Sequence, residues 1–266
     1  MGQVTEFAGS RLARFLTKPV RQSVQVATVN QEQLAATLQP GDVLLVEGDT
    51  RISVAIKYLT QSTWSHAALY IGDVLPHGAP WELPKVLIEA DLKEGVRAIT
   101  LAHYAQMHTR IFRPVGLSND DRKRVVDFAI SRMGHQYDLK HIFDLLRYLL
   151  PTAPVPTRFR RRLLALGSGD PTRAICSTLI AQAFESVRYP ILPEIKRAWS
   201  KDPKHSDCYA EIYHIRHHSL FTPRDFDISP YFDIIKPVLE NGFDYRKLAW
   251  SDADREDDPC GCDSSR

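Results

Sequence analysis

The stretch WSHAALYIGD, residues 64–73, predicts a β-strand that carries a histidine. Side chains alternate along an extended chain, so His66 would share one face with Ala68 and Tyr70, while the opposite face is apolar. A single histidine within a strand is most often structural. Here its neighbours are small, however, and they leave room beside His66 for a facing helix or a substrate.

Further strands are predicted around this stretch. The turn Pro40-Gly41-Asp42 precedes a short apolar run, and the helix that follows this run opens at residues 48–50. No helix of useful length fits between the later strands, so the sheet should be antiparallel and meander-like. The additional strands are expected at residues 43–46, 86–90, 96–101 and 109–115.

Helices dominate the second half of the chain. Ser118 is a suitable N-cap for a helix that ends near Gly134, and another helix is predicted at residues 139–150. The clearest helix begins at Cys176, where apolar residues recur with a 3.6-residue period as far as Val187. Beyond residue 200 the pattern is irregular. Strands first and helices later are typical of a single α+β domain.

Cys176 stands at the start of that helix, three residues after Arg173. Unpaired backbone N–H groups and the positive end of the helix dipole lower the pKa of a thiol there and favour the nucleophilic thiolate. The same N–H groups can receive a developing oxyanion. The alternative is an ordinary buried cysteine on an apolar helix face, and the position in the helix alone favours that alternative.

A thiol nucleophile needs a base, and the base needs a third group that fixes its orientation. His66 is the candidate base and Glu89 the candidate for the third group. Glu89 follows the apolar run Val86-Leu87-Ile88, where an unpaired charge is unfavourable and a histidine on a neighbouring strand would compensate it. The alternative for Glu89 is an acid on an edge strand that faces water.

Five segments, taken in order, resemble a known family. They are LQPGDVLLV, WSHAALYIGD, VLIEAD, GHQYD and ICSTLIAQAF, between residues 38 and 184. They are similar to the circularly permuted papain-fold cysteine hydrolases of the NlpC superfamily, the YiiX/YebB-like group, in which the histidine strand precedes the cysteine helix. The resemblance implies an α+β, permuted papain-like fold with an antiparallel sheet packed against the nucleophile helix.

The same resemblance implies roles for individual residues. It makes Cys176 the nucleophile, His66 the base and Glu89 the orienting acid. Tyr137 matches a tyrosine that lines the family's active site, and its hydroxyl could assist the oxyanion. The chain departs from the family at Thr178, where glutamate is common.

Composition and charge divide the chain into three parts. The net charge is only +2, from 34 basic and 32 acidic residues, which argues against a dedicated nucleic-acid-binding protein. Residues 1–37 form a basic segment that contains an amphipathic helix at residues 7–22. The hydrolase domain is expected at residues 38–240, with an exposed, arginine-rich insertion at residues 151–173. An acidic tail occupies residues 241–266.

Neither a membrane-spanning segment nor a signal peptide is predicted, so a cytoplasmic protein is expected. The helix at residues 7–22 would either lie on an anionic membrane surface or dock on its own protein, and the second is favoured. No cofactor is expected. The spacing of the local His/Cys cluster fits no common zinc pattern, so no metal is expected either. Its members are His205, Cys208, His214, His217 and His218.

Three functions compete. The first is a thiol hydrolase with a Cys-His-Glu triad that cleaves an amide, as an amidase or peptidase does. The second is a thiol acyltransferase or lipase that acts on lipid acyl groups at a membrane surface. It draws on the basic helix at residues 7–22, on the cluster Arg158 to Arg162, and on the family's lecithin-retinol acyltransferase relatives, which share the order of histidine strand before cysteine helix. The third is an inactive binding protein, and the presence of Cys176, His66 and Glu89 counts against it. The partner is therefore a peptide, amide or lipid acyl substrate.

Overall fold

The computed structural model describes Lys18 and residues 30–80, 82–92, 94–136, 175–199, 209–214 and 221–237. The predicted helix at residues 139–150, the insertion at residues 151–173, the acidic tail at residues 241–266 and the amphipathic helix at residues 7–22, except Lys18, lie outside these ranges. In the described part of the chain, no helix is both long enough and apolar enough to cross a membrane.

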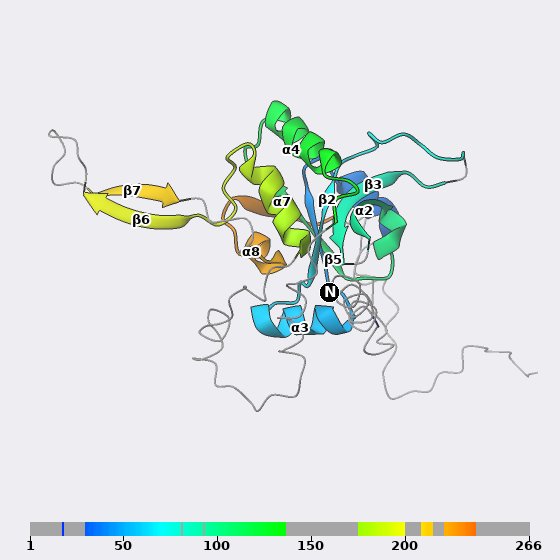
Figure 1. Ribbon diagram of the computed structural model, residues 1–266, viewed down its shortest axis with the longest axis horizontal. Coiled ribbons are helices and arrows are strands. Elements are labelled where there is room, and N and C mark those ends of the chain that lie inside the picture. The colour runs from blue at the N-terminus through cyan, green and yellow to red at the C-terminus, as the bar shows by residue number, and fades with distance from the viewer. Residues whose placement is uncertain are drawn as a thin grey trace, which may run out of the picture.

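A six-stranded sheet organises the described residues (Figure 1). Its strand order is β4-β3-β2-β1-β5-β8, and all of its pairs are antiparallel. The first four strands follow one another as a meander, as predicted, and β5 then returns to the other side of β1. The strands are β1 (Val43–Val46), β2 (His66–Tyr70), β3 (Lys85–Asp91), β4 (Gly95–Thr100), β5 (Thr109–Pro114) and β8 (Phe232–Ile235).

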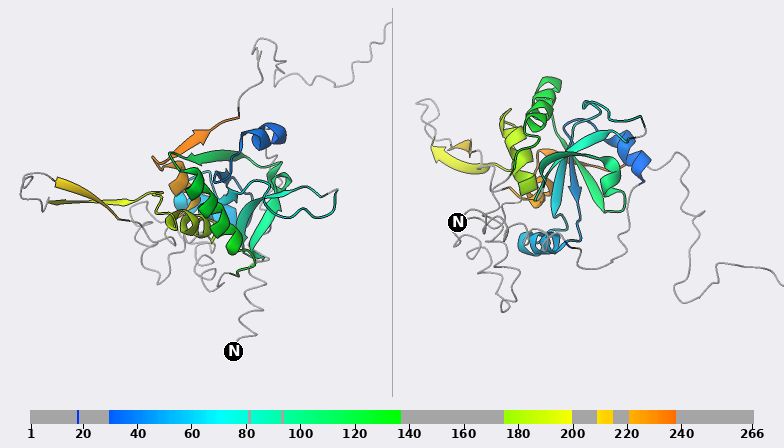
Figure 2. Two further views of the ribbon diagram at one scale, coloured as in Figure 1. Left: turned by 90° about the horizontal axis from the view of Figure 1, so that it is seen from above. Right: turned by 45° about the vertical axis from the view of Figure 1, so that its right-hand side comes forward.

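Helices cover both faces of the sheet (Figure 2). One core joins α4 and α7 to the face that carries Leu69 and Phe112, and a second core on the other face contains Leu34 of α2 and Tyr104 of η1. The mixed helices and antiparallel sheet agree with the expected α+β class. The helices are α2 (Gln31–Thr37), α3 (Arg51–Thr60), the 3-10 helix η1 (Leu101–Tyr104), α4 (Asn119–Ser131), α7 (Ile175–Glu185) and α8 (Pro223–Asp227).

The Pro40-Gly41-Asp42 turn sets the start of the central strand. Gly41 has a φ of 91°, which favours glycine, and Asp42 is fully buried. The Asp42 carboxylate accepts hydrogen bonds from the backbone N–H of Gln39, at 2.8 Å, and from Arg113 on β5, at 2.9 and 2.7 Å. These bonds tie the turn to the neighbouring strand, and β1 follows with all four residues buried.

The described residues from 194 onward are more regular than their sequence pattern predicts. Strands β6 (Glu194–Trp199) and β7 (Tyr209–His214) pair as a hairpin that extends away from the sheet (Figures 1 and 2). Strand β8 then joins the main sheet next to β5. These strands were missed because charged residues interrupt their apolar pattern.

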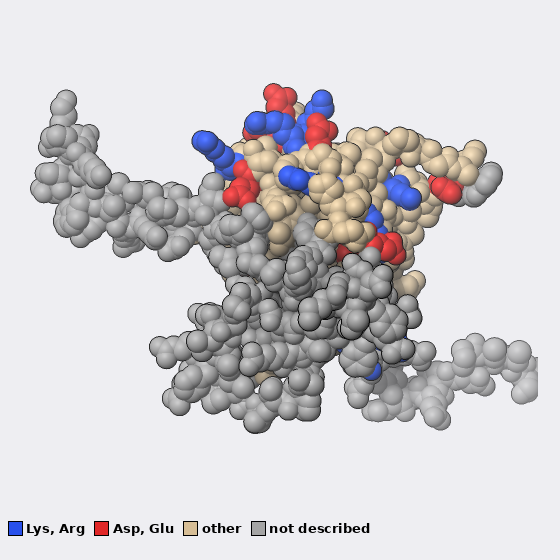
Figure 3. Space-filling view, in the orientation of Figure 1, with Lys and Arg blue, Asp and Glu red and all other residues tan. Residues whose placement is uncertain are grey.

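The face of the molecule in Figure 3 carries charges of both signs. Over α4, lysine and arginine side chains lie next to aspartate and glutamate side chains. Arg124 and Asp121 of this helix form an ion pair. The described residues on this face thus form no single-sign patch.

Candidate active site

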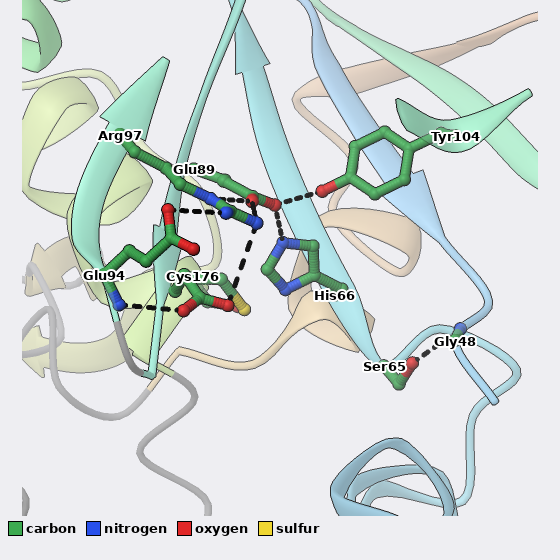
Figure 4. A network of polar contacts seen from close by, with 10 residues as sticks. Gly48, Ser65, His66, Glu89, Glu94, Arg97, Tyr104 and Cys176 are labelled. Atoms are coloured by element: carbon green, nitrogen blue, oxygen red, sulfur yellow. Dashed lines mark hydrogen bonds and ion pairs between the residues drawn. The ribbon is translucent and has the colours of Figure 1, made fainter. Parts of the chain in front are cut away.

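His66 is the first residue of β2, and its place at the strand end brings it to the N-terminal end of α7 (Figure 4). Its backbone pairs with Val46 at the end of β1. The neighbouring residues Ser65 and Ala67 are small and buried. The imidazole is partly exposed, so it remains accessible while its position is fixed by the sheet.

Glu89 lies inside β3, which is flanked by β2 and β4. Its side chain is only 3% exposed, so the alternative of an edge-strand acid facing water is wrong. A Glu89 oxygen, Oε2, lies 2.6 Å from Nε2 of His66. This contact uses one ring nitrogen of His66 and leaves Nδ1 for another partner.

Two residues that the sequence did not single out also hold Glu89. Arg97, directly opposite Glu89 on β4, donates from Nε and Nη2 to Oε1 at 2.8 and 2.7 Å. The hydroxyl of Tyr104, on η1, donates to Oε2. The carboxylate therefore has charged or polar partners on both oxygens. Only the strand register reveals Arg97, and no sequence signal marks Tyr104.

Cys176 is the second residue of α7, and the residue is 4% exposed. Figure 4 shows its sulfur beside the His66 ring, on the side of the nitrogen that Glu89 does not use. His66 and the backbone of Ala67 are the groups that favour the charged form of this sulfur, and the Ser177 hydroxyl lies 3.9 Å from it. The structure thus brings Cys176, His66 and Glu89 together from a helix and two strands.

The electrostatics of the three groups are coupled. Burial alone raises the pKa of the Cys176 thiol, but the charge of His66 and the hydrogen bond with it lower that pKa below its usual value. Burial alone lowers the pKa of His66, but Cys176 and Glu89 raise it well above the usual value. These directions favour a thiolate beside an imidazolium.

Glu89 is held in its charged form. Burial alone raises the pKa of this carboxyl group, but the hydrogen bonds and charge of His66, together with bonds from Tyr104 and Arg97, bring the pKa far below its usual range. Tyr104 shows the opposite effect, because burial and the Glu89 charge raise the pKa of its hydroxyl well above the usual value. Tyr104 is therefore a neutral hydrogen-bond donor.

Most of the remaining sequence-predicted residues are not described by the structure. Tyr137 lies outside the described residues, and so do four members of the His/Cys cluster, His205, Cys208, His217 and His218. Their fifth member, His214, ends strand β7. Within the described ranges, no group of three or more His, Cys, Asp or Glu side chains is arranged to hold a metal ion.

Comparison with known proteins finds a family model that matches part of the chain and a similar solved structure. No curated protein matches the sequence. Among solved structures, the metalloprotein yiiX from Escherichia coli O157:H7 is similar, with 15% sequence identity and a TM-score of 0.44 over 77% of this chain and 99% of that chain. The family model of the permuted papain-like amidases, the YaeF/YiiX or C92 family, matches residues 37–148, which include His66 and Glu89. The match confirms the YiiX-like resemblance: over residues 37–148 this chain is similar to a permuted papain-like amidase.

Proposed function

We propose that this protein is a thiol hydrolase that cleaves an amide bond, with Cys176 as nucleophile, His66 as acid and base, and Glu89 as the group that orients His66. One observation carries the proposal: the His66 ring lies between the Cys176 sulfur and a buried carboxylate (Figure 4). The match to permuted papain-like amidases supports the amide as the bond that is cleaved.

Acylation would begin with the Cys176 thiolate. Its sulfur attacks the carbonyl carbon of the amide, and the carbonyl oxygen takes the negative charge. As this tetrahedral species collapses, the C–N bond breaks and the His66 imidazolium gives its proton to the leaving nitrogen. The amine leaves, and the acyl group remains on Cys176 as a thioester.

Deacylation would reverse the role of His66. The neutral imidazole takes a proton from water, and the resulting hydroxide attacks the thioester carbonyl carbon. The C–S bond then breaks, the carboxylic acid leaves, and the thiolate–imidazolium pair is restored. Glu89 keeps its charge throughout and stabilises the imidazolium, since its partners hold its pKa far below the usual range.

The start of α7 supplies donors for the oxyanion. The first backbone N–H groups of a helix have no partner within the helix, and Cys176 is the second residue of α7. Such donors stabilise negative charge that develops on a carbonyl oxygen next to the nucleophile. Tyr137 is proposed as a further donor on the basis of the family resemblance alone.

The acyltransferase or lipase alternative rests on residues outside the described ranges. Its two sequence features, the basic helix at residues 7–22 and the cluster at Arg158 to Arg162, are not described apart from Lys18. The acyltransferase or lipase function is therefore tested together with the hydrolase function, by including acyl-ester substrates in the same experiment.

The test is a comparison of three forms of the full chain, wild type, Cys176→Ser and His66→Ala, on peptide-amide and acyl-ester libraries. We expect wild type to release amine from amides, and both variants to lose turnover while retaining the thermal midpoint of wild type within a few degrees. Ester cleavage or acyl transfer without amide cleavage would favour the second function. Amide turnover that survives in Cys176→Ser would rule out the proposed nucleophile.

A further inference from the structure

The two oxygens of Glu89 have separate partners. Oε2 accepts from His66 and Tyr104, whereas Oε1 accepts only from Arg97 among the hydrogen bonds of the described residues. A carboxylate bound on both oxygens cannot rotate about its terminal bond without losing bonds. Its direction toward His66 is therefore set from the far side, by Arg97.

Arg97 is itself held in place. It faces Glu89 across the β3–β4 pair, so the register of the sheet fixes its backbone. On its outer side, Nη1 lies 2.9 Å from the Glu94 carboxylate, and Nη2 lies 3.9 Å from that of Asp91 (Figure 4). The guanidinium thus contacts the carboxylates of Glu94 and Asp91 on one side and that of buried Glu89 on the other. Because an arginine side chain is planar, always charged and rich in donors, it can bind several carboxylates in a fixed geometry.

We propose that Arg97 is a positioning residue, which keeps Glu89 aimed at His66 and balances its charge beside the nucleophile. The inference rests on the proposed function, because the position of Glu89 affects the reaction only if His66 is the acid and base for Cys176. Without Arg97, the site carries one more uncompensated negative charge, and the Cys176 thiolate is destabilised. Glu89 also becomes free to turn, so it holds the His66 imidazolium less well.

The chain contains a matched control for this idea. Arg113 binds buried Asp42 through the same two nitrogens, Nε and Nη2, although these meet both Asp42 oxygens and those of Arg97 meet only Oε1 of Glu89. The exposed fractions of the two pairs are close: 22% and 0% for Arg113 and Asp42, against 25% and 3% for Arg97 and Glu89. Asp42 precedes β1, whereas His66 pairs with the last residue of that strand, so the control pair lies at the opposite end of β1 from the site. A loss of stability alone should therefore appear in both pairs.

The experiment measures alkylation of Cys176 by iodoacetamide from pH 5 to 9, by mass spectrometry, in wild type, Arg97→Gln, Arg97→Lys and Arg113→Gln. We expect the Arg97→Gln rate at pH 6 to fall roughly tenfold, equivalent to one unit of thiol pKa, with the midpoint of the pH profile moved upward. Arg97→Lys keeps the charge but cannot place two donors on Oε1, so its rate at pH 6 should lie between those of wild type and Arg97→Gln. Arg113→Gln should lower the thermal midpoint without moving the profile.

The outcomes separate the inference from the function on which it rests. If wild-type Cys176 reacts no faster at pH 6 than an ordinary thiol, the proposed function fails. If wild-type Cys176 is activated but Arg97→Gln matches Arg113→Gln in its pH profile, only the role of Arg97 fails. Should Arg97→Gln not fold, the Arg97→Lys profile decides: one of the two hydrogen bonds to Oε1 is lost there, so a profile and rate identical to wild type would overturn the positioning role.

Discussion

Replacing Glu89 with glutamine tests the site with little change of shape. Among the described residues, the groups that bind the two Glu89 oxygens are all donors: Arg97 on Oε1, and His66 and Tyr104 on Oε2. A glutamine side chain offers one acceptor oxygen and one NH₂ donor. Either Arg97 or the pair of His66 and Tyr104 must therefore face a donor.

The consequences can be estimated from these contacts. Breaking a buried ion pair by removing one partner costs about 3–5 kcal/mol. We expect the lower end, about 3 kcal/mol in the free energy of unfolding, because Arg97 keeps Glu94 and is partly exposed. For reactivity, one hydrogen bond to a charged group contributes about 1.5–3 kcal/mol, which corresponds to a rate of Cys176 alkylation lower by roughly 10- to 150-fold.

Turnover should fall further than the alkylation rate, because the glutamine NH₂ can stabilise the other tautomer of the neutral His66 ring. If the NH₂ donates to Nε2, the ring hydrogen moves to Nδ1, and the nitrogen beside Cys176 no longer accepts a proton. We expect the loss to remain smaller than that of His66→Ala, which deletes the base.

The assay compares Glu89→Gln with Glu94→Gln, a matched change on the other side of the same arginine. Glu94 is 63% exposed and does not contact His66, so its replacement should change the free energy of unfolding by less than about 1 kcal/mol and leave alkylation unchanged. Thermal unfolding and the rate of iodoacetamide labelling at pH 6 are measured for both variants. Equal labelling of Glu89→Gln and wild type would refute the orienting role of Glu89.

Four further outcomes are expected. His66→Ala should slow labelling of Cys176 at pH 6 at least tenfold, as peptide mass spectrometry will show, because the thiolate loses its cationic partner; faster labelling of the other cysteines would make Cys176 a core residue. Tyr104→Phe should lower the free energy of unfolding by about 1–3 kcal/mol in denaturant titrations, since it removes one donor to a buried carboxylate, and an unchanged midpoint would contradict that bond. Because its partners lower the pKa of Glu89, the carboxylate stabilises the fold fully above about pH 5 and progressively less as acid protonates it; Glu89→Gln should flatten the acid limb of unfolding free energy against pH. If the helix at residues 7–22 lies on a membrane surface, the full chain should co-sediment with anionic vesicles at low salt and lose this binding when residues 1–22 are deleted, whereas binding insensitive to salt and deletion would indicate that the segment docks on its own protein.

The strands of the main sheet could largely be predicted from short apolar runs. Residues 43–46 coincide with β1, and the run at residues 86–90 lies within β3. Strand β8 could not be found in this way, because it joins β5 from more than a hundred residues away and two of its four residues are exposed. Residues 232–235 form a strand because they pair with β5, and not because their own sequence has a strand pattern.

In the candidate site too, some residues could be predicted from a local sequence pattern and others could not. Glu89 stood out because a charge inside an apolar strand requires a partner, and its 2.6 Å contact with His66 supplies one. Arg97 and Tyr104 did not stand out, since arginine and tyrosine are ordinary at the ends and surfaces of strands. Their importance depends on the β3–β4 register and on the turn at η1, neither of which a local pattern specifies.

Stability alone does not account for the group around Glu89. A buried ion pair can often be replaced by well-packed apolar side chains without loss of stability, and sometimes with a gain. Here the buried carboxylate is surrounded by three donors, and one of them, His66, carries the next contact to a thiol at a helix start. Arg113 and Asp42 also form a buried pair, but theirs joins a turn to a strand. A pair whose bonds lead to a nucleophile is better explained by what it does to that nucleophile, and this difference is what the paired arginine variants measure.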